Sequence, residues 1–267
     1  MYQSHWGLRE SPFRSCLDPQ FFYQAATQEE GLARLHFLVD QRRRLGLLMG
    51  PGGSGKSLLL EVFARELRRE GRPVARLSAA GVEPAELLAA IATELGLAVD
   101  CSDNPAVLWR SVTDRVLEYR YQQQDTAILL DDADLAGRQS LVQIARLAHF
   151  DPSPEARLTM VLSGRRERMG RLGEPLLDLA DLRIDIEPWQ PEETRTFLDT
   201  VLTRAGGPPE VFAEPAASRL HELSHGIPRR VRQLADLALL AGAGRDLRQI
   251  DVDVVESVYH ELGVVEV

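Results

Sequence analysis

Short apolar runs alternate with longer amphipathic stretches over the first 190 residues of the chain. Runs of about five mostly apolar residues are typical of buried strands, whereas apolar residues recurring every three or four positions indicate helices. The runs predict five strands, at residues 45–49, 73–77, 126–130, 158–162 and 182–186. The helical spacing predicts helices at residues 58–67, 84–95, 105–122 and 139–149. Strands that alternate with helices favour parallel pairing and predict an α/β sheet with helices on both faces.

The pattern changes after the segment Pro188-Trp189-Gln190-Pro191. From there the spacing is mostly helical, and breaks that contain glycine and proline separate the helical stretches. These stretches are residues 192–204, 214–224, 228–240 and 252–262. We therefore expect two domains: residues 1–188 as an α/β core that includes the N-terminal segment, and residues 189–267 as a small helical lid.

Composition narrows the functional classes. A chain of 267 residues with 44% hydrophobic residues can bury one large core and a smaller one. The net charge of −9 argues against a surface coated with positive charge for nucleic acid. Three arginine clusters, at residues 42–44, 165–168 and 229–232, leave local contact with nucleic acid open.

The two cysteines and the first residues indicate the compartment. Cys16 and Cys101 have no close Cys or His at metal-ligand spacing, so neither a zinc site nor a disulfide framework is expected. The chain begins without a basic region followed by an apolar run, and no stretch reaches the length of a membrane span. We expect a cytoplasmic protein without a membrane segment in this chain.

A glycine-rich segment joins the first strand to the first helix: Gly50-Pro51-Gly52-Gly53-Ser54-Gly55-Lys56-Ser57, followed by Leu58. In such a loop successive backbone N–H groups converge on phosphate oxygens, and the following helix directs its positive end at them. Lys56 is expected between the terminal phosphates, and the Ser57 hydroxyl is expected on Mg²⁺. Because a strand precedes the complete motif and a helix follows it, residues 50–58 predict a site for ATP with Mg²⁺.

Lys56 is the only lysine among the 31 basic residues, all the others being arginine. A general preference for arginine is a compositional bias and needs no functional reason. A compact ammonium group on a flexible stem, however, reaches between phosphates in a way that the planar guanidinium does not. The position of the single lysine therefore agrees with the phosphate site.

An acidic pair follows the third predicted strand. Asp131 comes directly after the apolar run and is the expected Mg²⁺ partner, and Asp132 stands where such enzymes carry the residue that orients the attacking water. The alternative is that the pair caps the next helix. Asp134 is either a further acid of the site or that cap.

With these motifs the chain resembles AAA+ ATPases, and more specifically the ExeA/GspA group of secretion-pathway ATPases, related to transposition-helper ATPases. Besides the phosphate loop and Asp131-Asp132, the residues that carry the resemblance are His5-Trp6-Gly7-Leu8, Ser11-Pro12-Phe13, Asp18-Pro19, Phe21-Phe22-Tyr23, Pro188 to Thr194 and Gly226-Ile227-Pro228-Arg229-Arg230. The resemblance implies a five-stranded parallel sheet, a helical lid, and ATP bound between them, often at the edge of an oligomer.

The resemblance also assigns further site residues. Arg229 is similar to the second sensor arginine, which reaches from the lid toward the γ-phosphate, and Ser163 is the candidate first sensor. Aromatic and apolar residues near the N-terminus, Pro12, Phe13 and Tyr23, are candidates for the wall of the adenine pocket. The alternatives are a turn residue for Ser163, a surface arginine for Arg229, and ordinary packing for the remaining three.

Three departures from the family pattern bear on activity. Asp132 replaces the usual Glu, so the water could be poorly positioned and hydrolysis slow. No arginine lies at residues 177–180, where the resemblance leads us to expect one that reaches a neighbouring subunit. The possible substitutes are Arg183, Arg165, Arg166, Arg168 and Arg171. ExeA-type proteins often continue into a membrane anchor and a wall-binding module, whereas this chain stops at Val267.

The leading functional hypothesis is an ATPase that acts as a switch. It would bind and hydrolyse ATP with Mg²⁺, and so remodel or position a macromolecular partner in secretion or envelope assembly. We expect a protein partner and a homo-oligomer, and contact with nucleic acid is not favoured. The alternatives are a DNA-associated helper ATPase of the transposition or origin-recognition type, and a nucleotide-binding scaffold that hydrolyses slowly or not at all.

Overall fold

The computed structural model describes residues 2–13, 18–100 and 104–262. Cys16 and Cys101 lie outside these residues, so the predictions about them are not addressed. Contacts divide the chain into two compact units. The sheet unit contains residues 18–52 and 56–186, and the helical unit contains residues 2–13, 53–55 and 187–262. Within the described ranges, no helix is both long and apolar enough to cross a membrane.

The sheet unit is built on five parallel strands in the order β2-β3-β4-β1-β5. The strands are β1 (Leu45–Met49), β2 (Val74–Ser78), β3 (Thr126–Asp131), β4 (Leu158–Gly164) and β5 (Leu182–Asp185). Each lies within two residues of its predicted bounds. The predicted fold class, a five-stranded parallel sheet with helices around it and a helical C-terminal region, is confirmed.

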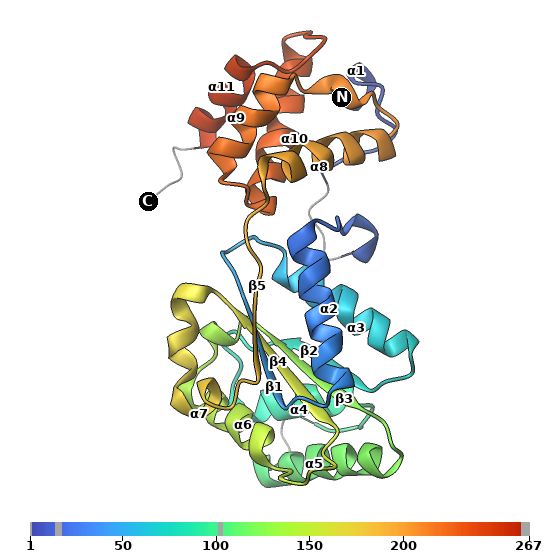
Figure 1. The fold of residues 1–267 in the computed structure, drawn as a ribbon, viewed down its shortest axis with the longest axis vertical. Helices are drawn as coiled ribbons and strands as arrows, with labels where there is room; N and C mark the ends of the chain where they lie inside the picture. The colour runs from blue at the N-terminus through green and yellow to red at the C-terminus, as the bar shows by residue number, and fades with distance from the viewer. Residues whose placement is uncertain (1, 14–17, 101–103, 263–267) are drawn as a thin grey trace. The chain divides into compact units, whose positions relative to one another are not determined.

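Helices cover both faces of this sheet (Figure 1). They are α2 (Ala26–Asp40), α3 (Lys56–Arg69), α4 (Pro84–Glu94), α5 (Pro105–Tyr121), α6 (Arg138–His149) and α7 (Glu174–Leu177), with 3₁₀ turns at η1 (Pro19–Phe21), η2 (Ala133–Leu135) and η3 (Arg166–Leu172). Successive strand residues point to opposite faces. Leu47 of β1 therefore joins the core under α4, α5 and α6, whereas Leu48 joins the core under α2 and α3.

The order of the strands determines where a ligand can bind. β1 lies between β4 and β5, and β3 lies beyond β4, although β2 and β3 follow β1 in the sequence. Because all five strands are parallel, the loops after β1, β3 and β4 leave the sheet side by side at its carboxyl edge. Open α/β sheets bind ligands at this edge, where the strand order reverses.

The helical unit consists mainly of four helices and the N-terminal segment. Its elements are α1 (Tyr2–His5), α8 (Pro191–Arg204), η4 (Pro209–Val211), α9 (Glu214–Ser224), α10 (Pro228–Gly244) and α11 (Val252–Leu262). α8 starts with a capping box, in which Gln190 and Glu193 satisfy each other's backbone N–H groups. The helices bury apolar stripes that include Phe197, Leu220 and Leu239.

Residues 2–13 pack within the helical unit. The indole Nε1 of the buried Trp6 donates a hydrogen bond of 2.9 Å to the carbonyl of Leu239 in α10. The Tyr2 hydroxyl donates to Asp236 at 2.6 Å, and the backbone N–H of Arg9 donates to the carbonyl of Ala205 at 2.7 Å. The predicted core, residues 1–188, includes this segment, but its contacts group it with the C-terminal helices.

Candidate nucleotide-binding site

The glycine-rich segment forms the loop between β1 and α3, as its spacing predicts. β1 ends at Met49 and α3 begins at Lys56, so residues 50–55 are the turn itself. Gly53 and Gly55 have φ angles of 88° and 97°, which side chains rarely allow. Ser57 and Leu58 lie in the first turn of α3, where free backbone N–H groups and the helix dipole favour an anion.

Lys56 is buried in this turn, with 8% of its surface exposed. Its Nζ donates hydrogen bonds of 2.9 Å to the carbonyls of Gly50 and Pro51. Burial lowers the pKa of Lys56, and the carboxylates of Asp131, Asp134 and Asp132 oppose this effect by favouring the charged form. The ammonium group therefore lies near enough to the acidic residues at the end of β3 for their charges to favour its protonated form.

Asp131 and Ser163 come together at the ends of neighbouring strands. Asp131 is the last residue of β3 and is buried. Its Oδ1 accepts hydrogen bonds from the hydroxyl of Ser163, which is fully buried in β4, and from the backbone N–H of Asp132. Ser163 is thus a partner of Asp131 inside the strand. Its role as a sensor of nucleotide stays a prediction.

The residues present fit a magnesium ion carried by a nucleotide. The two hydrogen bonds of Asp131 use Oδ1, which leaves Oδ2 for the ion, and Ser57 supplies a hydroxyl from the first turn of α3. In the described part of the chain, no group of three or more His, Cys, Asp or Glu side chains could hold a metal by itself. Mg²⁺ characteristically takes one or two carboxylates together with phosphates and water, which is what this arrangement offers.

Asp132 has an unusual backbone conformation. Its φ and ψ of 52° and 37° are left-handed, which aspartate and asparagine adopt more readily than most residues do. Burial raises the pKa of Asp132, and so do the neighbouring carboxylates of Asp131 and Asp134, whereas Lys56 and Arg165 lower it. Although Asp132 precedes η2, its side chain makes no capping hydrogen bond. The backbone conformation offers a physical reason for an aspartate, rather than a longer acid, at this position.

Asp134 lies within η2 and is almost fully buried, with 1% of its surface exposed. Neither carboxylate oxygen has a hydrogen-bond partner in the part of the chain that the structure describes. Of the two possibilities left open by the sequence, helix capping therefore does not apply. A buried, unpaired carboxylate is costly to fold, and no sequence pattern signalled the burial of this one.

The residues assigned by resemblance lie in both units. Arg229 is exposed in the first turn of α10, in the helical unit, and its reach toward a γ-phosphate stays a prediction. Phe13 is buried, and its ring centroid lies 6.1 Å from that of Phe197 in α8, a contact of the ordinary packing kind. Pro12 is also buried, and Tyr23 precedes α2 in the sheet unit. A contact of these residues with adenine stays a prediction.

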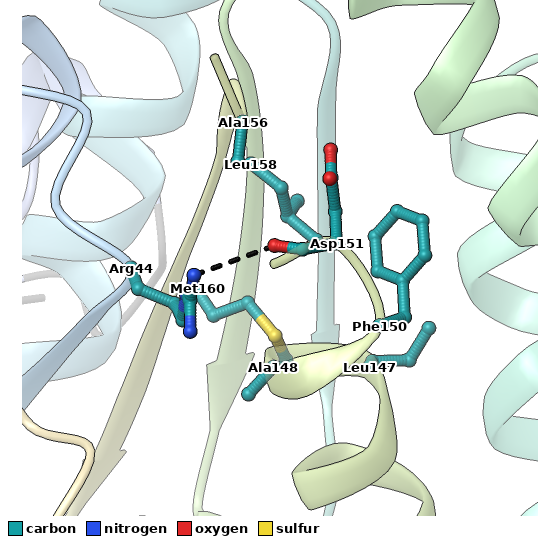
Figure 2. Close-up of a pocket in the computed structure, with 8 residues that line it drawn as sticks. All are labelled: Arg44, Leu147, Ala148, Phe150, Asp151, Ala156, Leu158 and Met160. Atoms are coloured by element: carbon teal, nitrogen blue, oxygen red, sulfur yellow. Dashed lines mark hydrogen bonds between the residues drawn. The ribbon is translucent and has the colours of Figure 1, made fainter. Parts of the chain in front are cut away.

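Two cavities lie at the opposite, amino edge of the sheet. The first, shown in Figure 2, lies between Arg44, Asp151 and Met160 and has a volume of about 10 Å³, enough for about one water molecule. Beside it an open groove of about 440 Å³ is lined by Arg42, Arg43 and carboxylates that include Asp181. Both are far along the strands from the glycine-rich loop, so neither belongs to the predicted phosphate site.

The parallel sheet, the glycine-rich loop after β1 and the acidic pair after β3 define a P-loop protein of the AAA class. The model of the AAA domain family AAA_22 matches residues 39–172, half of the chain, and the chain therefore belongs to this family. Among curated proteins, general secretion pathway protein A of Aeromonas hydrophila is 28% identical over 254 residues. The match covers 94% of this chain and 46% of that protein. The predicted resemblance to ExeA/GspA-type AAA ATPases is confirmed.

Two further relatives agree with this assignment. The RuvB subunit of the Holliday junction branch migration complex of Paracoccus denitrificans (strain Pd 1222) is 27% identical over 279 residues, covering 96% of this chain and 73% of RuvB. The solved structure of Cdc6p from Pyrobaculum aerophilum matches with a TM-score of 0.71 at 15% identity, over 92% of this chain and 70% of that one. At such low identity the second match shows the fold alone. The chain spans about half the length of general secretion pathway protein A.

Proposed function

We propose that this chain binds ATP with Mg²⁺ and hydrolyses it to ADP and phosphate. The observation that carries the proposal is the meeting of three groups at the carboxyl edge of one sheet: the loop of residues 50–57, the buried Lys56, and the acidic pair Asp131-Asp132. Membership of the AAA family supports it. P-loop enzymes accelerate phosphoryl transfer mainly by positioning and electrostatics, which these groups supply.

Each group has a proposed part in the reaction. Residues 50–58 hold the phosphate chain through backbone N–H groups, and Lys56 exchanges its two carbonyl acceptors for phosphate oxygens. Ser57 and Asp131 hold Mg²⁺, which neutralises charge on the phosphates when bound. Asp132 accepts a hydrogen bond from the attacking water and directs it at the γ-phosphorus. Arg229 and Ser163 report the state of the nucleotide.

We propose that the energy of this cycle changes how the protein holds a macromolecular partner, in secretion or envelope assembly. The similarity to general secretion pathway protein A over nearly the whole chain supports this choice. In this proposal the partner is a protein and the chain acts as a homo-oligomer. Sedimentation with ADP and with ATP tests the assembly, because a chain that stays monomeric with both nucleotides contradicts it.

The test of hydrolysis is Asp132→Asn. Asparagine keeps the shape and tolerates the left-handed backbone of Asp132, but it accepts a hydrogen bond from water less strongly than a carboxylate does. We expect phosphate release to fall about 100-fold or more, in the range of catalytic proton-accepting groups, and the affinity for MgATP to stay within about threefold. The matched control is Asp114→Asn, which changes an exposed aspartate of α5 and should leave both values unchanged.

The outcomes separate the possible functions. If the wild type binds MgATP but releases no phosphate, the chain is a nucleotide-binding scaffold. Normal turnover in Asp132→Asn would remove Asp132 from its role while leaving the ATPase assignment intact. A wild type that binds no nucleotide would overturn the proposal.

A DNA-associated helper ATPase is the second candidate, because one relative is a subunit of a branch migration complex. The first arginine cluster gives it little support. Arg42 pairs with Asp125 at 3.3 Å, and Arg43 lies 3.9 Å from Asp181, so nearby carboxylates offset their charge. Binding to duplex DNA, measured from 50 to 200 mM salt with and without ATP, decides between the candidates. Salt-dependent binding that ATP strengthens favours the helper, and no binding at 50 mM salt excludes it.

A further inference from the structure

An arginine lies directly against the phosphate loop within the sheet unit. Arg165 follows Gly164, the last residue of β4, at the same edge as the loop. A Cβ atom placed on Gly52 would lie 3.4 Å from Cζ, Nε and Nη2 of Arg165. The guanidinium group is therefore a close neighbour of the third residue of the motif.

The charge of Arg165 acts on the groups of the proposed reaction. It adds to the effect of burial in lowering the pKa of Lys56, and it lowers the pKa of Asp132 against the effects of burial and of the neighbouring carboxylates. Lys56 and Asp132 are the groups expected on the γ-phosphate and on the attacking water. The position of Arg165 beside Gly52 thus brings a positive charge near the groups proposed to act at the terminal phosphate.

Arg165 also differs from the arginine beside it. Arg166 is held by Asp185, with Nη2 2.9 Å from Oδ1. Arg165 is exposed, and among the described residues no carboxylate forms an ion pair with it. An arginine suits phosphate oxygens better than a lysine does, because its planar guanidinium group can donate hydrogen bonds to two oxygens at once.

We propose that Arg165 binds the γ-phosphate of ATP held by its own chain and stabilises the charge that develops during hydrolysis. The proposal rests on the proposed ATPase function and names the residue that fills the role of the absent arginine at residues 177–180. P-loop enzymes take this arginine either from the same chain or from a partner. Because Arg165 lies beside Gly52 of its own chain, we assign the arginine to the same chain as the phosphate loop.

The chemistry requires such a group. In hydrolysis the water oxygen forms a bond to the γ-phosphorus, and the bond from that phosphorus to the oxygen bridging it to the β-phosphate breaks. The bridging oxygen leaves with ADP and the water proton ends on the released phosphate or in solvent, so negative charge shifts toward the γ and bridging oxygens on the way. A guanidinium beside Gly52 can donate hydrogen bonds to those oxygens.

The first test compares Arg165→Ala with the matched control Arg166→Ala. We expect the turnover number of Arg165→Ala to fall about 100- to 1,000-fold, near the lower end of the effect of arginines in this role. Its affinity for ATP should fall about tenfold, and its affinity for ADP, which lacks the γ-phosphate, should stay within about twofold. Arg166→Ala should match the wild type in all three values. Arg165→Lys should recover ATP affinity more than turnover, because it restores the charge but not the fork.

The second test asks whether the arginine acts within its own chain. Lys56→Ala keeps Arg165 but lacks the phosphate-binding lysine, and Arg165→Ala has the opposite defect. Equimolar mixtures of the two variants should be no more active than the sum of their separate activities. Activity restored in the mixture would show that Arg165 serves a neighbouring subunit and would overturn the proposal.

The results distinguish this proposal from the function on which it rests. If the wild type binds and hydrolyses ATP, and Arg165→Ala matches Arg166→Ala in turnover and in the ratio of ATP to ADP affinity, the role of Arg165 is refuted and the ATPase stands. If the wild type binds ATP without hydrolysing it, the affinity ratio still tests the contact. A wild type that binds neither nucleotide refutes both. Equal melting temperatures for the two variants show that both are folded.

Discussion

The two edges of the sheet carry the same kinds of charged residues in opposite circumstances. At the amino edge, Arg157 pairs with Asp125 at 2.8 Å, and Arg120 reaches both oxygens of Asp151 at 3.1 and 3.0 Å. At the carboxyl edge, Asp134 has no hydrogen-bond partner and Arg165 no ion pair among the described residues. The amino edge pairs these charges within the fold, whereas in the described part of the chain Asp134 and Arg165 stay without such partners at the carboxyl edge, where Arg166 pairs with Asp185.

This difference distinguishes charged residues that stabilise the fold from charged residues available to a ligand, a distinction that the composition of the chain does not reveal. Even backbone groups at the amino edge use its carboxylates: Asp181 accepts hydrogen bonds from the N–H groups of Arg44 and Leu45, at 2.8 and 3.2 Å. Charges that are paired in this way stabilise the fold, whereas a buried unpaired charge such as that of Asp134 costs free energy unless a ligand meets it. The phosphate chain and its metal ion are ligands of the required charge.

The largest expected effect contrasts one cation from each edge. Lys56→Ala should lower the affinity for MgATP by about 10- to 100-fold, because hydrogen bonds between charged groups contribute about 1.5–3 kcal/mol. Arg44→Ala removes a positive charge from the amino edge and should leave the affinity within about twofold. Titration calorimetry with ATP measures both. Equal affinities for Lys56→Ala and the wild type would contradict the phosphate site itself.

Removing one carboxylate from each edge should change the free energy of unfolding by a smaller amount and in opposite directions. Asp134→Asn removes a buried, unpaired charge with little change in shape, so we expect the free energy of unfolding to rise by about 1–3 kcal/mol. Asp125→Asn removes the negative charge that pairs with Arg157 and with Arg42. It should lower the free energy of unfolding by about 1 kcal/mol. Urea unfolding in the absence of nucleotide and divalent ions provides the comparison. A loss of stability in Asp134→Asn similar to that in Asp125→Asn would mean that the two edges do not differ.

The smallest expected effect concerns an exposed ion pair at the amino edge. Arg43 is half exposed and lies 3.9 Å from Asp181, so the pair is weak even though it belongs to the amino edge. Arg43→Gln should change the free energy of unfolding by less than about 0.5 kcal/mol, the usual range for exposed pairs. The same urea experiment measures it. A loss above 1 kcal/mol would indicate that the exposed rim, and not only the partly buried pairs, stabilises the amino edge.

The sheet could be predicted from the sequence because its central strands are buried on both faces. Such strands appear as continuous apolar runs, and those of β1, β3 and β4 were found within two residues. The helix α2 was not predicted. Its sequence contains Gly31, which lowers helix propensity, and its apolar positions give only a weak stripe.

The phosphate loop and the acidic pair could be predicted because their residues are close in sequence and their spacing is set by chemistry. The contact between Gly52 and Arg165 could not be predicted, because the two lie far apart in the chain and only the strand order brings β1 beside β4. The burial of Asp134 likewise depends on neighbouring elements rather than on the local sequence. Sequence patterns give the elements, and tertiary packing decides which charged groups remain without partners.

The hydrogen bond from Trp6 to Leu239 spans 233 residues of chain and makes the sheet unit an insertion within the helical one. Contacts of such long range form slowly, because a large loop must close before they contribute. During synthesis the sheet unit can fold as soon as its last strand is made. The N-terminal segment must wait for α10, exposing Trp6 meanwhile, so the helical unit should be the last part of the protein to complete its folding.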